Sequence, residues 1–203
     1  MTTLETYQRG LLDLVKGRAL SPTDPYLATV EGSSGIVVVR EIAVWWRAFQ
    51  IASQCPLVTR VLRHYGCFDA TIGEYFANHR TSPFVEELTD HFLDVLGGHA
   101  DPFLRSVARF ERALLRVRAG SEESHEIYFD RNPDAVFDVL EQGGAIPAAE
   151  RECGYRMTVS RRLPGLFCCE REHSKGWRRR LLPARLPDSS HQRHRGVDRE
   201  TPK

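Results

Sequence analysis

The stretch VVVREIAVWWRAFQIASQCP, from Val37 to Pro56, decides the expected fold, because it is an apolar helix pattern that holds two adjacent tryptophans of a chain with three. Apolar or aromatic side chains recur at the spacing of one helix face at Val38, Ile42, Trp45, Phe49 and Ala52. Val39, Ala43 and Trp46 widen this face. A face this wide predicts a helix in the middle of a helical array. For Trp45 and Trp46 the pattern favours core packing over a ligand-stacking platform.

The other side of this helix pattern is polar, with Arg40, Glu41, Arg47 and Gln50. The interruption and the length of the stretch therefore exclude a membrane helix. The start of the chain, MTTLETYQRGLLDLVKG, carries acidic residues within its apolar pattern and no basic segment before it, so no secretory signal is expected. These features predict a cytoplasmic protein.

The five cysteines form an odd set without a CxxC pair: Cys55, Cys67, Cys153, Cys168 and Cys169. In a reducing compartment such cysteines are expected to be free thiols. The adjacent pair Cys168 and Cys169 is compatible with a redox or metal site, but alternate faces of one strand explain the pair more simply.

Charge is distributed unevenly along the chain. Of 28 basic and 27 acidic residues, ten Lys or Arg and four Asp or Glu lie in residues 171–203, which leaves 18 basic and 23 acidic residues in 1–170. A nucleic-acid-binding body is expected to show the opposite balance, because contacts from Lys and Arg to phosphate supply most non-specific affinity. Nucleic acid is therefore disfavoured as a partner.

Caps, prolines and glycines divide the first part of the chain into successive helices. Besides the central stretch, helices are expected from Leu4 to Gly17, from Pro56 to Gly66, from Phe68 to Asn78, from Ser82 to Gly97 and from Asp101 to Leu115. At Gly120 the pattern changes to short strands. Strands are expected at His125 to Asp130, Tyr155 to Ser160 and Leu166 to Cys169, with a helix from Asn132 to Gly143 between the first two.

The expected fold class is α+β: an N-terminal all-α helical array, a small C-terminal β-α-β-β unit and a disordered basic tail. The expected domains are residues 1–119, a small α/β peptide-recognition domain at 120–170, and the tail at 171–203. Apolar periodicity fades beyond Glu170, so the tail is expected to be dispensable for folding and for partner binding.

Catalytic and metal motifs with the required spacing are absent from the sequence. The nearest cluster of possible metal ligands, His64, His79, His91, Asp90 and Glu87, is spread over three expected helices, and surface histidines are the favoured interpretation. Glu111 sits within an apolar face, which predicts a buried carboxylate in an ion pair with Arg109, Arg112 or Arg40. The residues thus predict neither catalytic nor metal-binding side chains, and no cofactor in this chain.

A family resemblance rests on the order and spacing of several blocks between Arg40 and Arg116. These blocks are Arg40 to Trp46, CPLVTRVLRHYGCF, the segment from Tyr75-Phe76 to Ser82-Pro83, HFLDVL and FLRSVARFERALL. They resemble a helical family formerly labelled as a DNA-binding domain. Members of that family are small partner subunits of multinuclear non-haem iron oxygenases of TIM-barrel fold. These enzymes modify cysteine in ribosomally made peptides. IYFDRNPDAVFDVLEQGG and GYRMTVSRRLPGLF are similar to the C-terminal part of such partners, so the resemblance runs from about Leu4 to Glu170.

The resemblance implies a non-catalytic subunit that forms a heterodimer with the iron oxygenase and recognises the leader of a ribosomal carrier peptide. The thiaglutamate-type partner is favoured over the methanobactin-type partner on overall likeness. Iron is then expected in the partner enzyme. The alternative is a DNA-binding transcriptional regulator, which the negative body and the lack of a short helix-turn-helix signature disfavour. A stand-alone enzyme using Cys168 or Cys169 ranks last, because no matched base is present.

Peptide recognition is expected at an open edge of the small sheet, where an extended peptide can add a strand. The receiving strand is expected to be either His125 to Asp130 or Tyr155 to Ser160. The expected peptide-binding residues are Ile127, Phe129, Tyr155, Met157, Thr158 and Val159. The competing interpretation is that residues 144–153, or the enzyme, cover this edge.

Overall fold

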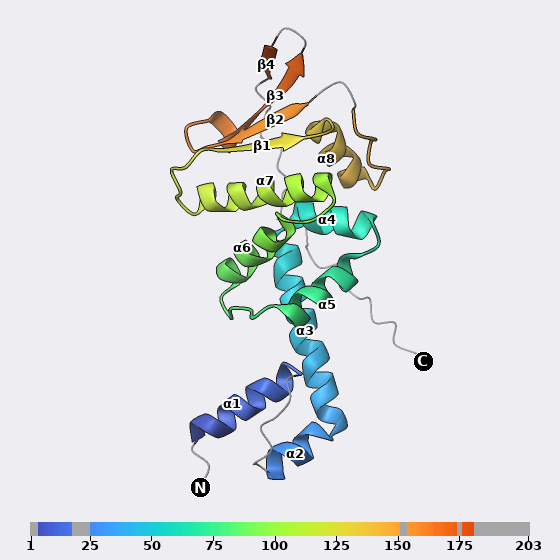
Figure 1. Ribbon diagram of the computed structural model, residues 1–203, viewed down its shortest axis with the longest axis vertical. Helices are drawn as coiled ribbons and strands as arrows, with labels where there is room; N and C mark the ends of the chain where they lie inside the picture. Colours follow the sequence, from blue (N-terminus) through green and yellow to red (C-terminus); the bar gives the residue numbers. More distant parts are fainter. Residues whose placement is uncertain (1–3, 18–24, 151–153, 174–175, 181–203) are drawn as a thin grey trace, which may run out of the picture. The chain divides into compact units, whose positions relative to one another are not determined.

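A computed structural model describes residues 4–17, 25–150, 154–173 and 176–180. Helices dominate the first part, and an antiparallel sheet lies near the C-terminus, which confirms the expected α+β class (Figure 1). The chain divides into two compact units, one of residues 1–54 and 67–89 and one of residues 55–66 and 90–203. This grouping differs from a division at Gly120, since two helices from before that residue belong to the second unit, one packed on the sheet and the other on that helix.

The first unit holds α1 (Leu4–Val15), α2 (Pro25–Glu31), α3 (Ser34–Gln54), α5 (Phe68–Asn78) and the beginning of α6 (Val85–Leu96). A small core joins α1, α2 and α3 through Leu14, Leu27 and Ile36, with Tyr7, Leu11, Val15 and Val30 packed around it. Gly10 of α1 permits the close approach of Leu27, because a Cβ at this position would collide with the leucine side chain. The amphipathic pattern of α1 thus produces a three-helix contact.

The polar side of α3 is the one that packs within this unit. Arg40 donates from Nε to the carbonyl oxygen of Leu14 at 2.6 Å. Arg47 bonds to the Thr81 hydroxyl and lies 5.8 Å from the centre of the Phe76 ring. Long arginine side chains can cover apolar surface with their stems while the guanidinium reaches a fixed acceptor, so this side forms contacts despite its charge.

The expectation that the tryptophans pack in the core is wrong. Trp45 is 63% exposed and Trp46 is 52% exposed. Both rings stack on Phe49, with centroid distances of 5.9 Å and 5.7 Å, and so form a surface aromatic cluster. Helical periodicity identifies an apolar face, but it does not show whether another element of the same chain covers that face.

The second unit contains α4 (Pro56–His64), the rest of α6, α7 (Pro102–Arg118), α8 (Pro133–Gln142) and a four-stranded sheet. Its strands are β1 (His125–Phe129), β2 (Tyr155–Val159), β3 (Phe167–His173) and β4 (Gly176–Arg180), in the order β1-β2-β3-β4 with antiparallel neighbours. A short 3₁₀ helix, Pro164–Leu166, precedes β3. Figure 1 shows α7 between the sheet and α4, and both neighbours contact it.

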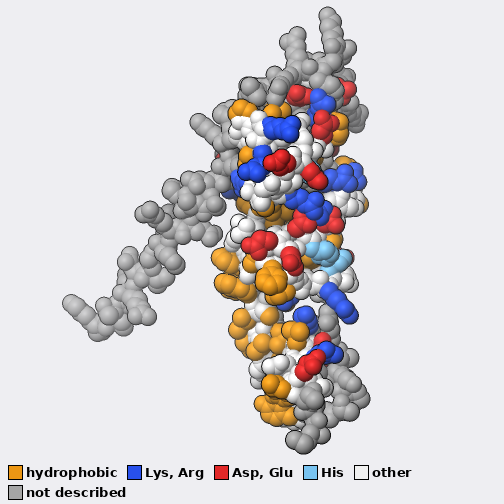
Figure 2. Space-filling view, turned by 90° about the vertical axis from the view of Figure 1, so that its left-hand side faces the viewer, with side chains coloured by type: hydrophobic (Ala, Val, Ile, Leu, Met, Phe, Trp, Pro, Cys, Tyr) orange, Lys and Arg blue, Asp and Glu red, His pale blue; other side chains and the backbone are white. Residues whose placement is uncertain are grey.

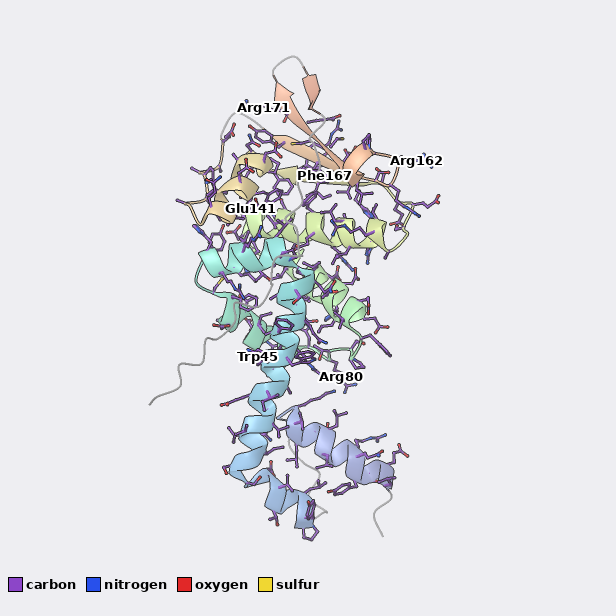
Figure 3. All side chains as sticks on the ribbon, turned by 180° about the vertical axis from the view of Figure 1, so that it is seen from behind. Trp45, Arg80, Glu141, Arg162, Phe167 and Arg171 are labelled. Atoms are coloured by element: carbon purple, nitrogen blue, oxygen red, sulfur yellow. The ribbon has the colours of Figure 1, made fainter. Side chains whose placement is uncertain are left out.

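Aromatic packing joins this sheet to its helices. Phe110 of α7 lies 6.2 Å from Phe129, 5.8 Å from Phe137 and 5.5 Å from Phe167, measured between ring centres (Phe167 is labelled in Figure 3). The alternating burial of β1 and β2 places the odd-numbered side chains of both strands on this inner face. The core of the second unit therefore lies between the sheet and α7.

Glu111 of α7 is buried as expected, but its partner differs from the expected arginine. Its carboxylate oxygens accept the backbone N–H groups of Leu57 at 2.8 Å and Val58 at 2.9 Å. These groups belong to the first turn of α4, whose N-cap residue, Cys55, makes no side-chain capping bond. The first N–H groups of a helix lack partners within it, so a distant carboxylate supplies the missing acceptors.

The C-terminal segment also departs from expectation. β3 continues through Arg171 to His173, and β4 pairs with it from Gly176 to Arg180, where a disordered tail is expected. Backbone pairing with an existing strand needs no apolar periodicity, which explains why the sequence pattern missed it. The expectation for residues 181–203 lies outside the described residues.

Candidate protein and peptide interaction surfaces

A broad apolar surface lies on α3, here called the α3 apolar face. Its members are the exposed residues Val38, Val39, Ile42, Trp45, Trp46 and Phe49. Figure 2 shows hydrophobic side chains gathered where α3 lies, and Figure 3 labels Trp45 on this helix. A whole aromatic side chain has an accessible area of about 150–250 Å². Scaled by their exposed fractions, the six side chains together expose roughly 500 Å². Exposed apolar patches of roughly 300–600 Å² are often functional, so this face is a candidate protein interface.

A second candidate surface lies on the open edge of β1. Ser160 donates its N–H to Leu166, and Gly154 accepts from Glu172, so the even-numbered residues of β2 direct their backbone groups toward β3. The odd-numbered residues of β2 then bond to the odd-numbered residues of β1, because both backbone groups of a residue point to the same side. Glu126 and Tyr128 therefore direct their backbone groups away from the sheet.

Other parts of the second unit occupy some of this edge. The Ser106 hydroxyl of α7 donates to the Tyr128 carbonyl oxygen at 2.6 Å. Just beyond the strand, the Glu150 N–H donates to the Asp130 carbonyl oxygen at 2.8 Å. Coverage by residues 144–153 is thus confirmed at Asp130, and the N–H and C=O of Glu126 lie on the part of the edge that remains for an added strand.

A cavity of about 390 Å³ lies between this edge and α7. Its lining residues are Pro102, Arg105, Ser106, Arg109, Glu126, Ile127, Tyr128, Phe129 and Asp130. Arg105 and Arg109 are one helical turn apart, so their guanidinium groups can reach the same side of the cavity. Arg109 donates through Nε to the Gly97 carbonyl oxygen at 2.9 Å, and Arg105 donates through one Nη to the His99 carbonyl oxygen at 3.5 Å.

The acidic side chains around this cavity already have cationic neighbours. Asp130 accepts two hydrogen bonds from Arg131, at 2.8 Å and 2.9 Å. The same ion pair raises the pKa of the Arg131 guanidinium. Glu126 has an oxygen 3.6 Å from Arg156 and accepts a hydrogen bond from the Tyr128 hydroxyl at 3.3 Å. Within the described residues, Arg105 and Arg109 form no ion pair, so two guanidinium groups without an acidic partner line the cavity.

The expected peptide-binding side chains are mostly part of the core. Ile127, Phe129, Tyr155, Met157 and Val159 are all buried on the inner face of the sheet. Ile127 and Phe129 nevertheless line the cavity beside the β1 edge. The side chains of the β2 residues support the sheet, and contact with a peptide would require them to leave the core.

The expectation that β2 is a possible receiving edge is wrong, because β2 lies between β1 and β3. Thr158 is half-buried and pairs with Glu126 on one side and Cys168 on the other. Its N–H points toward β3, so a proline at this position would disrupt the sheet itself. The outer strands of the described sheet are β1 and β4.

Sequence reasoning missed the α7 contribution to the cavity. The spacing of Arg105 and Arg109 places them on one helix side, and Ser106 lies beside them. This pattern is typical of a solvated helix face. Only the folding of β1 against α7 brings these residues to a strand edge about twenty positions further along the chain.

Cys55 and the residues weighed as possible metal ligands can be located in the structure. Burial and the nearby Glu111 carboxylate raise the pKa of the Cys55 thiol, which disfavours the reactive thiolate. In the described part of the chain, no three or more His, Cys, Asp or Glu side chains are grouped to hold a metal ion. Within the described residues no disulfide joins Cys55, Cys67, Cys168 or Cys169, and Cys153 lies outside those residues.

None of the helices in the described ranges combines the length and apolar character that crossing a membrane requires. Comparisons with protein-family models, curated proteins and solved structures give no match to this chain.

Proposed function

We propose that this chain is a non-catalytic, cytoplasmic partner subunit of a multinuclear iron oxygenase of TIM-barrel fold. In this role it recognises the leader of a ribosomally made carrier peptide, and the enzyme modifies a cysteine of that peptide. The proposal takes the enzyme and the peptide class from the family resemblance of the blocks between Arg40 and Arg116. Iron belongs to the partner enzyme in this scheme.

The observation that carries the proposal is the α3 apolar face. Its roughly 500 Å² is more than half of the roughly 800 Å² that each partner contributes to a stable interface. Aromatic residues are enriched in the energetically dominant part of such interfaces. The cationic side chains on α3, Arg40 and Arg47, are held by acceptors within the first unit. A partner can therefore cover the aromatic residues without burying these arginines unpaired.

Peptide recognition is supported separately by the β1 edge. The backbone groups of Glu126 can pair with an extended peptide, and the adjoining cavity can take one of its side chains. Main-chain hydrogen bonds then supply affinity, and the cavity supplies selection.

The enzyme-binding part is tested by co-expressing the full chain with a TIM-barrel multinuclear iron oxygenase from the same genome and measuring the mass of the purified complex. A one-to-one complex is expected. Trp45→Gln combined with Ile42→Gln should weaken it at least a hundredfold, because both side chains lie at the centre of the α3 apolar face. The matched control is Phe84→Gln, which replaces an exposed aromatic side chain outside α3.

Wild-type complex formation by the doubly substituted chain would contradict docking on α3. A dimer of the chain alone that these substitutions convert to a monomer would show that a second copy occupies the face, and would also contradict enzyme docking there.

The peptide-binding part is tested by panning the full chain against a displayed library of random 12-residue peptides. Selected peptides are then synthesised and their affinities measured by fluorescence anisotropy. Glu126→Pro should weaken binding, because it removes the outward N–H and leaves the bonds to β2 in place. Glu126→Ala is the control for loss of the carboxylate. Equal affinities for the wild type and a folded Glu126→Pro variant would rule out this edge.

A further inference from the structure

The cavity beside β1 is lined by two arginines. Neither strand addition by a peptide nor the family resemblance accounts for positive charge at this place. Arg105 and Arg109 line it from α7, one turn apart, and each is bonded to a main-chain carbonyl oxygen. A guanidinium group has five N–H donors. Both side chains therefore keep several donors after these bonds, and the bonds restrict how far each group can move.

The two acidic residues that line the cavity form no ion pair with these arginines. Asp130 is held by both Nε and Nη2 of Arg131, and that guanidinium is also stacked 4.5 Å from the centre of the Phe103 ring. Glu126 lies 3.6 Å from Arg156, which also donates two hydrogen bonds to Glu170. Asp130 is thus matched by Arg131, and Arg156 is shared between Glu126 and Glu170, whereas Arg105 and Arg109 form no ion pair in the described residues.

The remaining lining is apolar or neutral: Pro102, Ser106, Ile127, Tyr128 and Phe129. A partly enclosed site of this kind strengthens a charge-assisted hydrogen bond relative to open solvent. Planar guanidinium groups suit a carboxylate in particular, since two parallel N–H donors match its two oxygens.

From this geometry we infer that the cavity binds a carboxylate of the peptide that pairs with β1. The carboxylate belongs either to an Asp or Glu side chain or to the C-terminus of the peptide. A peptide that fits this site has an acidic group at a fixed distance from the segment that pairs with Glu126. This inference rests on the proposed binding of a peptide at the β1 edge.

The test uses the peptides selected by panning, each synthesised with Asp or Glu replaced by Asn or Gln, and with a free or an amidated C-terminus. Binding to the full chain is measured by fluorescence anisotropy. Loss of the critical carboxylate should weaken binding about tenfold, the effect of one charge-assisted hydrogen bond in a partly exposed site. The side-chain and the C-terminal series show which carboxylate is bound.

Substitutions in the protein complete the test. Arg105→Gln and Arg109→Gln should each weaken the acidic peptide and leave the affinity of its neutral form unchanged. Arg109→Glu should favour a peptide with Lys at the critical position. The matched control is Arg118→Gln, an exposed arginine of the same helix outside the cavity, which should have no effect.

The outcomes separate the two proposals. If Glu126→Pro weakens binding but neutral and acidic peptides bind equally well, the carboxylate inference is wrong and edge binding stands. If Glu126→Pro has no effect on binding, edge binding fails and the inference fails with it. If Arg118→Gln weakens binding as much as Arg109→Gln, overall charge is the cause, which also overturns a specific site.

Discussion

Replacement of Glu111 offers a direct test of how the second unit is held together. This side chain is 3% exposed and accepts the N–H groups of Leu57 and Val58. Glu111→Ala would leave both buried donors without an acceptor, at about 1–3 kcal/mol each, and would add a cavity. We expect the free energy of unfolding to fall by about 3–5 kcal/mol, a large part of the total for a protein of this size. The Tm should then fall by roughly 6–20 °C.

The same residue predicts a pH dependence. Burial raises the pKa of Glu111 from 4.5 to about 7, and the two backbone N–H bonds act in the opposite direction. Between these values the folded chain binds a proton that the unfolded chain has released, so stability decreases as the pH rises. The contribution of this group to the free energy of unfolding should fall by about 2.5 kcal/mol between pH 5 and pH 8.

The assay is urea-induced unfolding of the full chain, followed by far-UV circular dichroism at pH 5 and pH 8. Glu111→Gln has nearly the same shape and does not titrate. The stability advantage of the wild type over this variant should therefore be smaller at pH 8 by about 2.5 kcal/mol. Glu122→Gln, at an exposed carboxylate, is the control for general charge effects. A wild-type advantage over Glu111→Gln that is equal at both pH values would refute this account of the buried carboxylate.

Further substitutions test other contacts by thermal and urea unfolding. Asp101→Ala removes the acceptor for the N–H groups of Phe103 and Leu104 and should cost about 1 kcal/mol; an unchanged unfolding midpoint would argue against this cap. Phe110→Ala empties the centre of the aromatic cluster and should cost about 3–5 kcal/mol, whereas Phe110→Leu should cost less; equal costs would argue against a packed cluster. Ending the chain after Glu170 removes β4 and the Arg171 contact to Glu150, and should lower the free energy of unfolding by about 1–2 kcal/mol; an unchanged unfolding midpoint would show that this pairing is dispensable.

Local signals in the sequence were sufficient for most individual elements. Asp101-Pro102 and Asn132-Pro133 place a capping side chain before a proline at the first helical position, and both begin a helix as expected. Gly143 ends α8 with a positive φ of 72°, a conformation that glycine adopts without strain. These features depend on residues adjacent in the chain, which is why the α+β class and most of the helices and strands could be predicted, whereas α2 and β4 were missed.

The candidate surfaces depended on contacts between distant residues. Apolar periodicity located the α3 apolar face, but its exposure follows from Arg40 and Arg47 packing on the opposite side. The cavity beside the β1 edge exists because α7 lies against that strand.

The sequence by itself determined most of the segments that form helices and strands and which of their faces are apolar, because propensity, capping and periodicity act over a few residues. The tertiary structure alone decided which apolar face stays uncovered, which strand is an edge and which partner Glu111 receives. Those outcomes depend on which elements approach one another, and residues such as Glu111 and Leu57 come into contact only after the chain between them has folded.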